Sequence, residues 1–398
     1  MSVATTTSPE QHGAKAHSDG GWDATDKGFV PVQTRSERFA SNDPAEHPAV
    51  TGREFEWKFA PVDLVRPLID DALDGSPYPY LANESNGVTV EWITTDDARV
   101  GSAGTAEEKS SANAWAGTEL ALAVTVSGDE RVDTTIARSG FGAAPRAAHT
   151  VITAKANSTG IVVLQNSGAA ALSENVEIVV EDGAHLTVVT VQEFDAESTY
   201  LASHFARVGR NANLRHVIVS LGGKVVRVNP TVHLEGEGSE TDMFGLYFAD
   251  SGQHLEQRPY LHHAGAHTKG RVNYKGALQG AGAHTVWVGD VLIGRDAAGT
   301  DSYEQNRNLV LTEGTRADSI PNLEIETGDI QGAGHASATG RFDDEQLFYL
   351  QARGITEHEA RRLVVLGFLT EIIQQIGKPE LEERLQAAVE AELNGTTV

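Results

Sequence analysis

The residue with the clearest chemical potential in this sequence is a histidine, His335, which stands beside Gly332, Ala333 and Gly334. A neutral imidazole is a good ligand for iron or zinc. We expect its small neighbours to form a turn that lets another surface approach and leaves the imidazole uncovered. His335 is therefore a candidate metal ligand, and the alternative is a surface or hydrogen-bonded histidine at a turn, which is a common role.

A second group of histidines is closer together in the sequence. It contains His262, His263 and His267, with His254 and His284 not far away. In a β-region, His262 and His263 would point to opposite faces, so they would not converge on one ion. The tetrapeptide Gly-Ala-His-Thr around His267 occurs again around His284, which is typical of a repeated turn or ladder position. We therefore expect a structural role for this group.

Five carboxylates suggest another kind of chemistry. Paired acids serve as general acid and base, or bind calcium, in carbohydrate-active β-helix enzymes. Asp343 and Asp344, however, precede a helical segment and are more simply explained as its amino-terminal cap. Neither a nucleophile elbow nor a G-x-x-x-x-G-K-[ST] phosphate loop occurs, so any ATP hydrolysis would belong to another subunit. The five carboxylates are Glu324, Glu326, Asp329, Asp343 and Asp344.

Composition restricts the partners. The sequence has 31 basic and 56 acidic residues and a formal net charge of -25, which repels phosphate backbones, so no nucleic-acid partner is expected. It has no cysteine, so it offers no thiolate for metal binding or sulfur transfer. No apolar run reaches the roughly 18 residues of a membrane span, and the first residues lack the pattern of a signal peptide. We expect a cytoplasmic protein without a membrane partner.

The candidate residues lie in a chain that divides into four segments. Residues 1–50 have no apolar period and are expected to be a disordered lead. Residues 51–150 are expected to form an amino-terminal α/β subdomain that starts with a helix between residues 57 and 73. Residues 151–345 contain short β-branched runs separated by turns, without intervening helices. This pattern fits a parallel β-helix, and a β-sandwich is the alternative that it leaves open.

The fourth segment, residues 346–398, is expected to be a carboxyl-terminal helical subdomain. Thr356 with Glu359 three residues later forms a capping box, and apolar residues then recur at helical spacing until Gly377. Pro379 opens a second helix with an apolar side. Short amphipathic helices at the end of a chain are suited to docking in the groove of a partner.

Five segments resemble those of a known family, in the expected order. They are GREFEWKFAP at 52–61, RVNYKG at 271–276, TDSYEQNRNLVL at 300–311, IPNLEI at 320–325 and GHASATGRFDDEQLFYLQARG at 334–354. Together they resemble the SufB/SufD family, the scaffold subunits of the SUF iron-sulfur cluster assembly machinery. The resemblance implies a mainly β protein, in which a right-handed parallel β-helix core is flanked by an amino-terminal helical or α/β region and by carboxyl-terminal helices.

The resemblance also implies a role for a chain without cysteine. SufB-type chains are expected to carry the working cysteine, so this chain resembles SufD, a non-catalytic scaffold subunit of the SufB-SufC-SufD complex. His335 falls on the histidine that SufD-like chains present to SufB, where it is a candidate ligand of iron or of the cluster. Ala333 stands where many SufD chains have a cysteine, which argues against a second ligand supplied by SufD.

Partners and cofactors follow from the same resemblance. A SufB-like paralogue would pair through β-helix surfaces, and a SufC-like ABC ATPase would bind the carboxyl-terminal helices and strain the SufB-SufD interface when it closes on ATP. A nascent iron-sulfur cluster or iron would be shared with the partner and not held stably by the isolated chain. The resemblance allows a flavin in the complex, without assigning residues to it. The alternative function is a β-helix lyase or hydrolase acting on carbohydrate, which would need an export signal and more than the 6% aromatic residues present.

Overall fold

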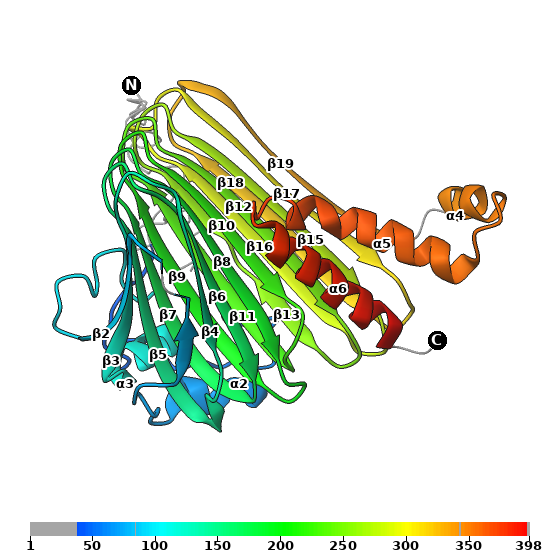
Figure 1. Ribbon diagram of the computed structural model, residues 1–398, viewed down its shortest axis with the longest axis horizontal. Helices are drawn as coiled ribbons and strands as arrows, with labels where there is room; N and C mark the ends of the chain where they lie inside the picture. Colours follow the sequence, from blue (N-terminus) through cyan, green and yellow to red (C-terminus); the bar gives the residue numbers. More distant parts are fainter. Residues whose placement is uncertain (1–37, 84, 342–343, 396–398) are drawn as a thin grey trace, which may run out of the picture.

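The computed structural model of this protein describes residues 38–83, 85–341 and 344–395. It is mainly β, with 48% strand and 16% helix, and its strands form a β-solenoid of about 8 turns (Figure 1). The expected parallel β-helix core is confirmed, and the β-sandwich alternative is wrong. Residues 1–37, which make up most of the expected lead, lie outside the described residues.

The strands form two sheets, and from β3 onward the chain alternates between them, except that β13 and β14 follow one another in the same sheet. Pairing is parallel except between β1 and β4 and between β2 and β3. Among the described residues, the first sheet contains β1 (Tyr80–Ala82), β4 (Val132–Arg138), β6 (Thr159–Gly168), β8 (His185–Phe194), β10 (Asn213–Ser220), β12 (Glu240–Ala249), β15 (Lys269–Leu278), β17 (Thr300–Val310) and β19 (Ile330–Arg341). The second sheet contains β2 (Val88–Thr94), β3 (Leu120–Val126), β5 (Gly142–Ala154), β7 (Ala170–Val180), β9 (Thr199–Val208), β11 (Val225–Leu234), β13 (His254–Gln257), β14 (Tyr260–His263), β16 (His284–Ile293) and β18 (Arg316–Ile325).

Parallel pairing keeps equivalent positions of successive turns in line. Val162 of β6 pairs with Val188 of β8, and both side chains are buried in the core between the sheets. Burial of such apolar stacks is the main favourable term in a solenoid, because each turn covers the apolar face of the next. The parallel pairing of β3 with β5 and of β4 with β6 begins before residue 151, where we expected the core to start.

Two helices pack on the outer face of the second sheet. In α2 (Val62–Asp70), Val65 and Leu68 pack with Leu201 and Val225 of the sheet. In α3 (Lys109–Gly117), a serine hydroxyl donates a hydrogen bond to a buried asparagine of β7. The helix expected between residues 57 and 73 is shorter than predicted, since it begins after Pro61 and ends at Asp70.

The carboxyl-terminal helices are α4 (Asp344–Gln351), α5 (Glu357–Ile373) and α6 (Pro379–Gly395). The expected Thr356 N-cap is present, because Thr356 Oγ1 accepts a hydrogen bond of 3.3 Å from the backbone N–H of Glu359. The Glu359 side chain accepts hydrogen bonds from Arg362, so the reciprocal half of the capping box is not formed. Apolar residues of α5 and α6 pack on the outer face of the first sheet, and Figure 1 shows α4 extending away from the solenoid. In the described part of the chain, no helix has the length and apolar character needed to cross a membrane.

Candidate functional site

His335 lies in β19, the last strand of the first sheet. Within the described residues, β19 pairs only with β17, so its other edge is free, and 46% of the His335 side chain is exposed. Figure 1 shows β19 along the edge of the solenoid. The expected turn is therefore wrong: His335 is in a strand, and it is accessible because that strand belongs to the last turn of the solenoid.

A ladder of inward-facing residues leads to His335. Parallel pairing aligns Met243 of β12, Val272 of β15, Glu304 of β17 and His335 of β19. Met243 and Val272 belong to the buried apolar core. Glu304 therefore has an apolar neighbour on one side and His335 on the other, where Glu304 Oε1 lies 3.8 Å from His335 Nδ1.

Glu304 is a buried acid without a hydrogen bond of normal geometry. Its side chain is 0% exposed, and neither carboxylate oxygen has a hydrogen-bond partner among the described residues. Burial and, to a smaller extent, the charge of Asp290 raise the pKa of Glu304 to about 8, although the nearby backbone amide of Asn322 acts in the opposite direction. Because an unpartnered carboxyl group is costly in a protein interior, its presence here needs an explanation.

Glu304 was not predicted from the sequence as a functional residue. A signal was present in β17, where every second residue is polar: Ser302, Glu304, Asn306 and Asn308 are all buried. Inward positions of a solenoid strand are usually apolar, so a polar run at those positions marks the strand as special.

The other inward residues at this end of the solenoid are joined by hydrogen bonds. Ser337 Oγ donates to Ser319 Oγ over 2.9 Å, and Ser319 Oγ donates to Asn306 Oδ1 over 2.7 Å. Ala333 packs on the apolar core and offers no ligand atom. These hydrogen bonds leave Glu304 and His335 unused, so the two side chains are the donor groups that could act together here.

The structure separates the three crowded histidines. His263 is buried, with Nδ1 2.8 Å from Thr268 Oγ1 and Nε2 3.0 Å from Ser302 Oγ, and burial lowers the pKa of His263 to about 3. His262 is partly exposed and lies beside another histidine of the sheet rather than beside His263. His267 has a positive φ of 57° at a turn. Their surroundings fit the expected structural role.

His254 and His284 form a pair on adjacent strands. Their Nδ1 atoms are 3.1 Å apart, while Nε2 of His284 lies 2.7 Å from Asp318 Oδ2 and Nε2 of His254 lies 3.1 Å from Glu256 Oε2. This hydrogen-bonded chain explains their position without a ligand. In the part of the chain that the structure describes, no group of three or more His, Cys, Asp or Glu residues is arranged to hold a metal ion.

The carboxylates named in the sequence analysis have separate surroundings. Glu324 lies near the end of β18, and Glu326 forms a contact of 3.7 Å with Arg295. Asp329 is exposed just before β19. Asp343 and the side chain of Asp344 lie outside the described residues. This arrangement does not favour the carbohydrate-active alternative.

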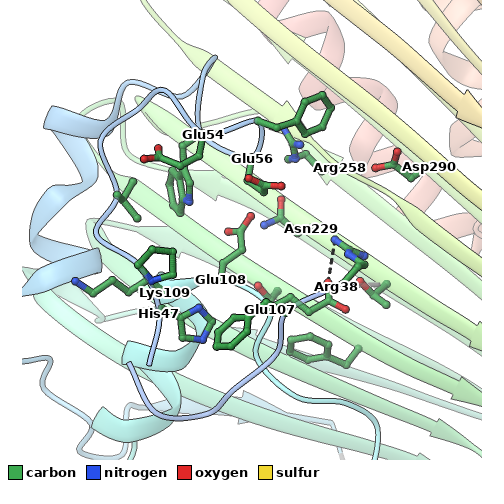
Figure 2. A pocket seen from close by; sticks show the side chains of 18 of the residues that line it. Arg38, His47, Glu54, Glu56, Glu107, Glu108, Lys109, Asn229, Arg258 and Asp290 are labelled. Atoms are coloured by element: carbon green, nitrogen blue, oxygen red, sulfur yellow. Dashed lines mark ion pairs between the residues drawn. The ribbon is translucent and has the colours of Figure 1, made fainter. Parts of the chain in front are cut away.

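A cavity of about 780 Å³ lies between the second sheet and the segment that precedes α2 (Figure 2). Its described lining includes five acidic side chains against two arginines and one lysine. Arg38 forms an ion pair of 2.9 Å with Glu107, marked by the dashed line in Figure 2. Burial raises the pKa of Glu107, although this arginine favours its charged form. An acidic cavity of this kind is poorly suited to the phosphate of a flavin nucleotide, so the flavin expectation keeps no residue assignment.

The chain is similar to proteins of one family over most of its length. The family model described as "SUF system FeS cluster assembly, SufBD core domain" matches residues 137–368. The chain is 46% identical to an iron-sulfur cluster assembly SufBD family protein of Mycobacterium bovis over 376 residues, which are 92% of this chain and 94% of the relative. A relative with the same description from Mycobacterium leprae is 46% identical over 368 residues, 90% of this chain and 94% of the relative.

Mycobacterium leprae also has a second, more distant SufBD family protein. It is 28% identical over 220 residues, which cover 55% of this chain and 25% of that protein. The family model spans more than half of the chain, and the first relatives match almost all of it. The chain therefore belongs to the SufBD family of iron-sulfur cluster assembly proteins.

Proposed function

We propose that this chain is a SufD-like, non-catalytic scaffold subunit that works in the cytoplasm with a SufB-like paralogue and a SufC-like ATPase. The main support for the proposal is that the chain belongs to the SufBD family and has no cysteine. Iron-sulfur clusters are held mainly by thiolates, so sulfur and thiolate ligands must come from another chain. The two SufBD family proteins of Mycobacterium leprae, one similar and one more distant, support a pair of unlike subunits.

The proposed SufB-like partner would cover the open end of the solenoid. Among the described residues, β18 pairs only with β16 and β19 only with β17, so each presents a free edge. Free strand edges are ready to pair with another sheet. Ile325, which is 43% exposed, adds apolar surface at the end of β18. In this arrangement His335 would face the partner, and iron or the nascent cluster would be the cargo at the interface.

The proposed ATPase would bind at α4. The apolar sides of α5 and α6 are already buried on the first sheet, so they are not free for a partner. On α4, the side chains of Phe348 and Tyr349 are 72% and 55% exposed. Exposed aromatic residues on a projecting helix are suited to a hydrophobic groove.

A double variant tests this docking site. Phe348→Ser with Tyr349→Ser should weaken capture of the ATPase at least about tenfold, because each aromatic residue contributes roughly 1.5–3 kcal/mol when it becomes buried. Quantitative pull-down with purified ATPase measures the effect. Leu81→Ser is the matched control, since Leu81 is 79% exposed on β1. Equal capture by the double variant and the control would exclude α4 as the docking site.

The scaffold role itself is tested at His335. His335→Ala should leave folding and assembly of the complex intact, since an edge-strand side chain contributes little packing, and should slow iron-sulfur cluster formation at least about tenfold. Cluster formation by the purified complex, followed by absorbance and by iron and sulfide analysis, measures this. His185→Ala, which removes an exposed histidine of β8, is the control. A normal rate with His335→Ala would reject the ligand role.

A further inference from the structure

Glu304 and His335 are placed to act as a pair. β17 and β19 are parallel, and the register sets Glu304 directly beside His335, so both side chains leave the sheet on the same side. Glu304 is fully buried, while His335 is half exposed. An ion that reaches His335 from the surface therefore meets the carboxyl group of Glu304 immediately behind it, and this group can bind the ion once it releases its proton.

Glu304 and His335 do not form a hydrogen bond with each other. The 3.8 Å between His335 Nδ1 and Glu304 Oε1 is too long for a hydrogen bond. Both oxygens of Glu304 lack hydrogen-bond partners among the described residues. A residue kept only for packing would be better as leucine at this position, because leucine buries no unpartnered polar group. The lack of a partner for the Glu304 carboxyl group points to a ligand that is not part of this chain.

The distance suits a metal ion. Bonds from imidazole nitrogen and from carboxylate oxygen to a first-row metal are each about 2.0–2.2 Å, so two donor atoms 3.8 Å apart can bind one ion between them. Space for the carboxylate is provided by Gly289, where an added Cβ would lie 2.4 Å from Glu304 Oε2 and 2.3 Å from the ring of Trp287. Imidazole together with carboxylate is a donor set that ferrous iron accepts.

We propose that Glu304 and His335 form a two-donor binding site for ferrous iron at the open end of the solenoid, with the remaining coordination positions left for sulfide or for the partner chain. This inference rests on the proposed function, because it names a second ligand for the same cargo. It also replaces the expectation, based on Ala333, that this chain supplies a single ligand.

The experiment uses the isolated full chain and ferrous iron under anaerobic conditions. Iron bound at His335 should protect its imidazole from carbethoxylation by diethyl pyrocarbonate, which peptide mass spectrometry reads at that residue alone. Glu304→Gln should raise the iron concentration for half-protection at least about tenfold, because it removes one ligand and keeps the side-chain shape. Asp329→Asn removes an exposed acid just before β19 and should leave that concentration unchanged.

An unchanged half-protection concentration in Glu304→Gln would overturn the inference, as would a loss of protection in Asp329→Asn equal to that in Glu304→Gln. The outcome is separable from the proposed function. If His335→Ala stops cluster formation while Glu304→Gln binds iron normally, the scaffold role stands and the second ligand is wrong. If Glu304→Gln weakens iron binding while His335→Ala complexes form clusters normally, the site exists but does not serve assembly.

Discussion

Two glutamates inside the solenoid, Glu174 and Glu304, are equally buried and have opposite surroundings. Each side chain is 0% exposed. Glu174 lies on β7, where Arg138 binds both of its carboxylate oxygens and Tyr200 donates a hydrogen bond of 2.8 Å. Glu304 lies ten strands later in the chain order, on β17, and has no hydrogen-bond partner among the described residues.

The surroundings of Glu174 indicate a structural role, whereas those of Glu304 indicate a functional one. Around Glu174, Thr150 donates to the carboxylate over 3.0 Å, and Arg138 also donates to Asn166 and Tyr78. Although burial alone would lower it, the pKa of Arg138 is raised by the charge of Glu174. A buried ion pair of this kind is tolerable because its polar atoms are satisfied. Glu304 has no neighbouring cation and no such set of hydrogen bonds, which is typical of a carboxyl group that binds a ligand.

The largest effect on stability is expected at the ion pair between Arg138 and Glu174. Arg138→Met should reduce the free energy of unfolding by about 3–5 kcal/mol, because it leaves Glu174 charged, buried and without its cation. Urea denaturation followed by tryptophan fluorescence measures this. Arg210→Met is the matched control, since Arg210 is 65% exposed in an ion pair of 3.5 Å with Asp182, where the loss should be no more than about 1 kcal/mol. If both variants lost the same free energy of unfolding, the ion pair of Glu174 would contribute no more than an ordinary surface ion pair.

The parts of the fold that depend on local signals were predictable from the sequence. The N-cap at Thr356, the stop near Gly377 and the proline at 379 gave α5 and α6 close to their observed bounds. The short β-branched runs indicated the strands of the solenoid. Local backbone preference and side-chain period are properties of short segments, so they are visible without the partners of each strand.

The parts that depend on tertiary pairing were not predictable in the same way. Glu304 and His335 are 31 positions apart in sequence and become neighbours only through the register of β17 and β19, which no local pattern specifies. The apolar sides of α5 and α6 were expected to face a partner, but the first sheet of the same chain covers them. An amphipathic helix shows that it has a buried side and does not show what buries it.

A smaller effect, with a pH dependence, is expected at Glu304, where Asp290 and His335 are the titratable groups that face it. Because the pKa of Glu304 is raised from 4.5 to about 8, the folded chain holds a proton that the unfolded chain has lost, and stability therefore falls as pH rises through this interval. Glu304→Gln cannot lose a proton, so its stability relative to the wild type should grow between pH 5.5 and 8.5. The stability change between these two pH values corresponds to a little over two pKa units at about 1.4 kcal/mol each, so the gain should be about 3 kcal/mol.

Urea denaturation of both chains at the two pH values measures this gain, with Asp329→Asn as a control that removes an exposed acidic side chain just before the neighbouring strand β19. A constant difference between wild type and Glu304→Gln across the interval would mean that Glu304 is compensated in the free protein as Glu174 is. The two glutamates would then differ only in which neighbouring groups stabilise their carboxylates. A growing difference would show that the isolated chain carries a destabilised carboxyl group, whose free-energy cost is released when a cation binds beside His335.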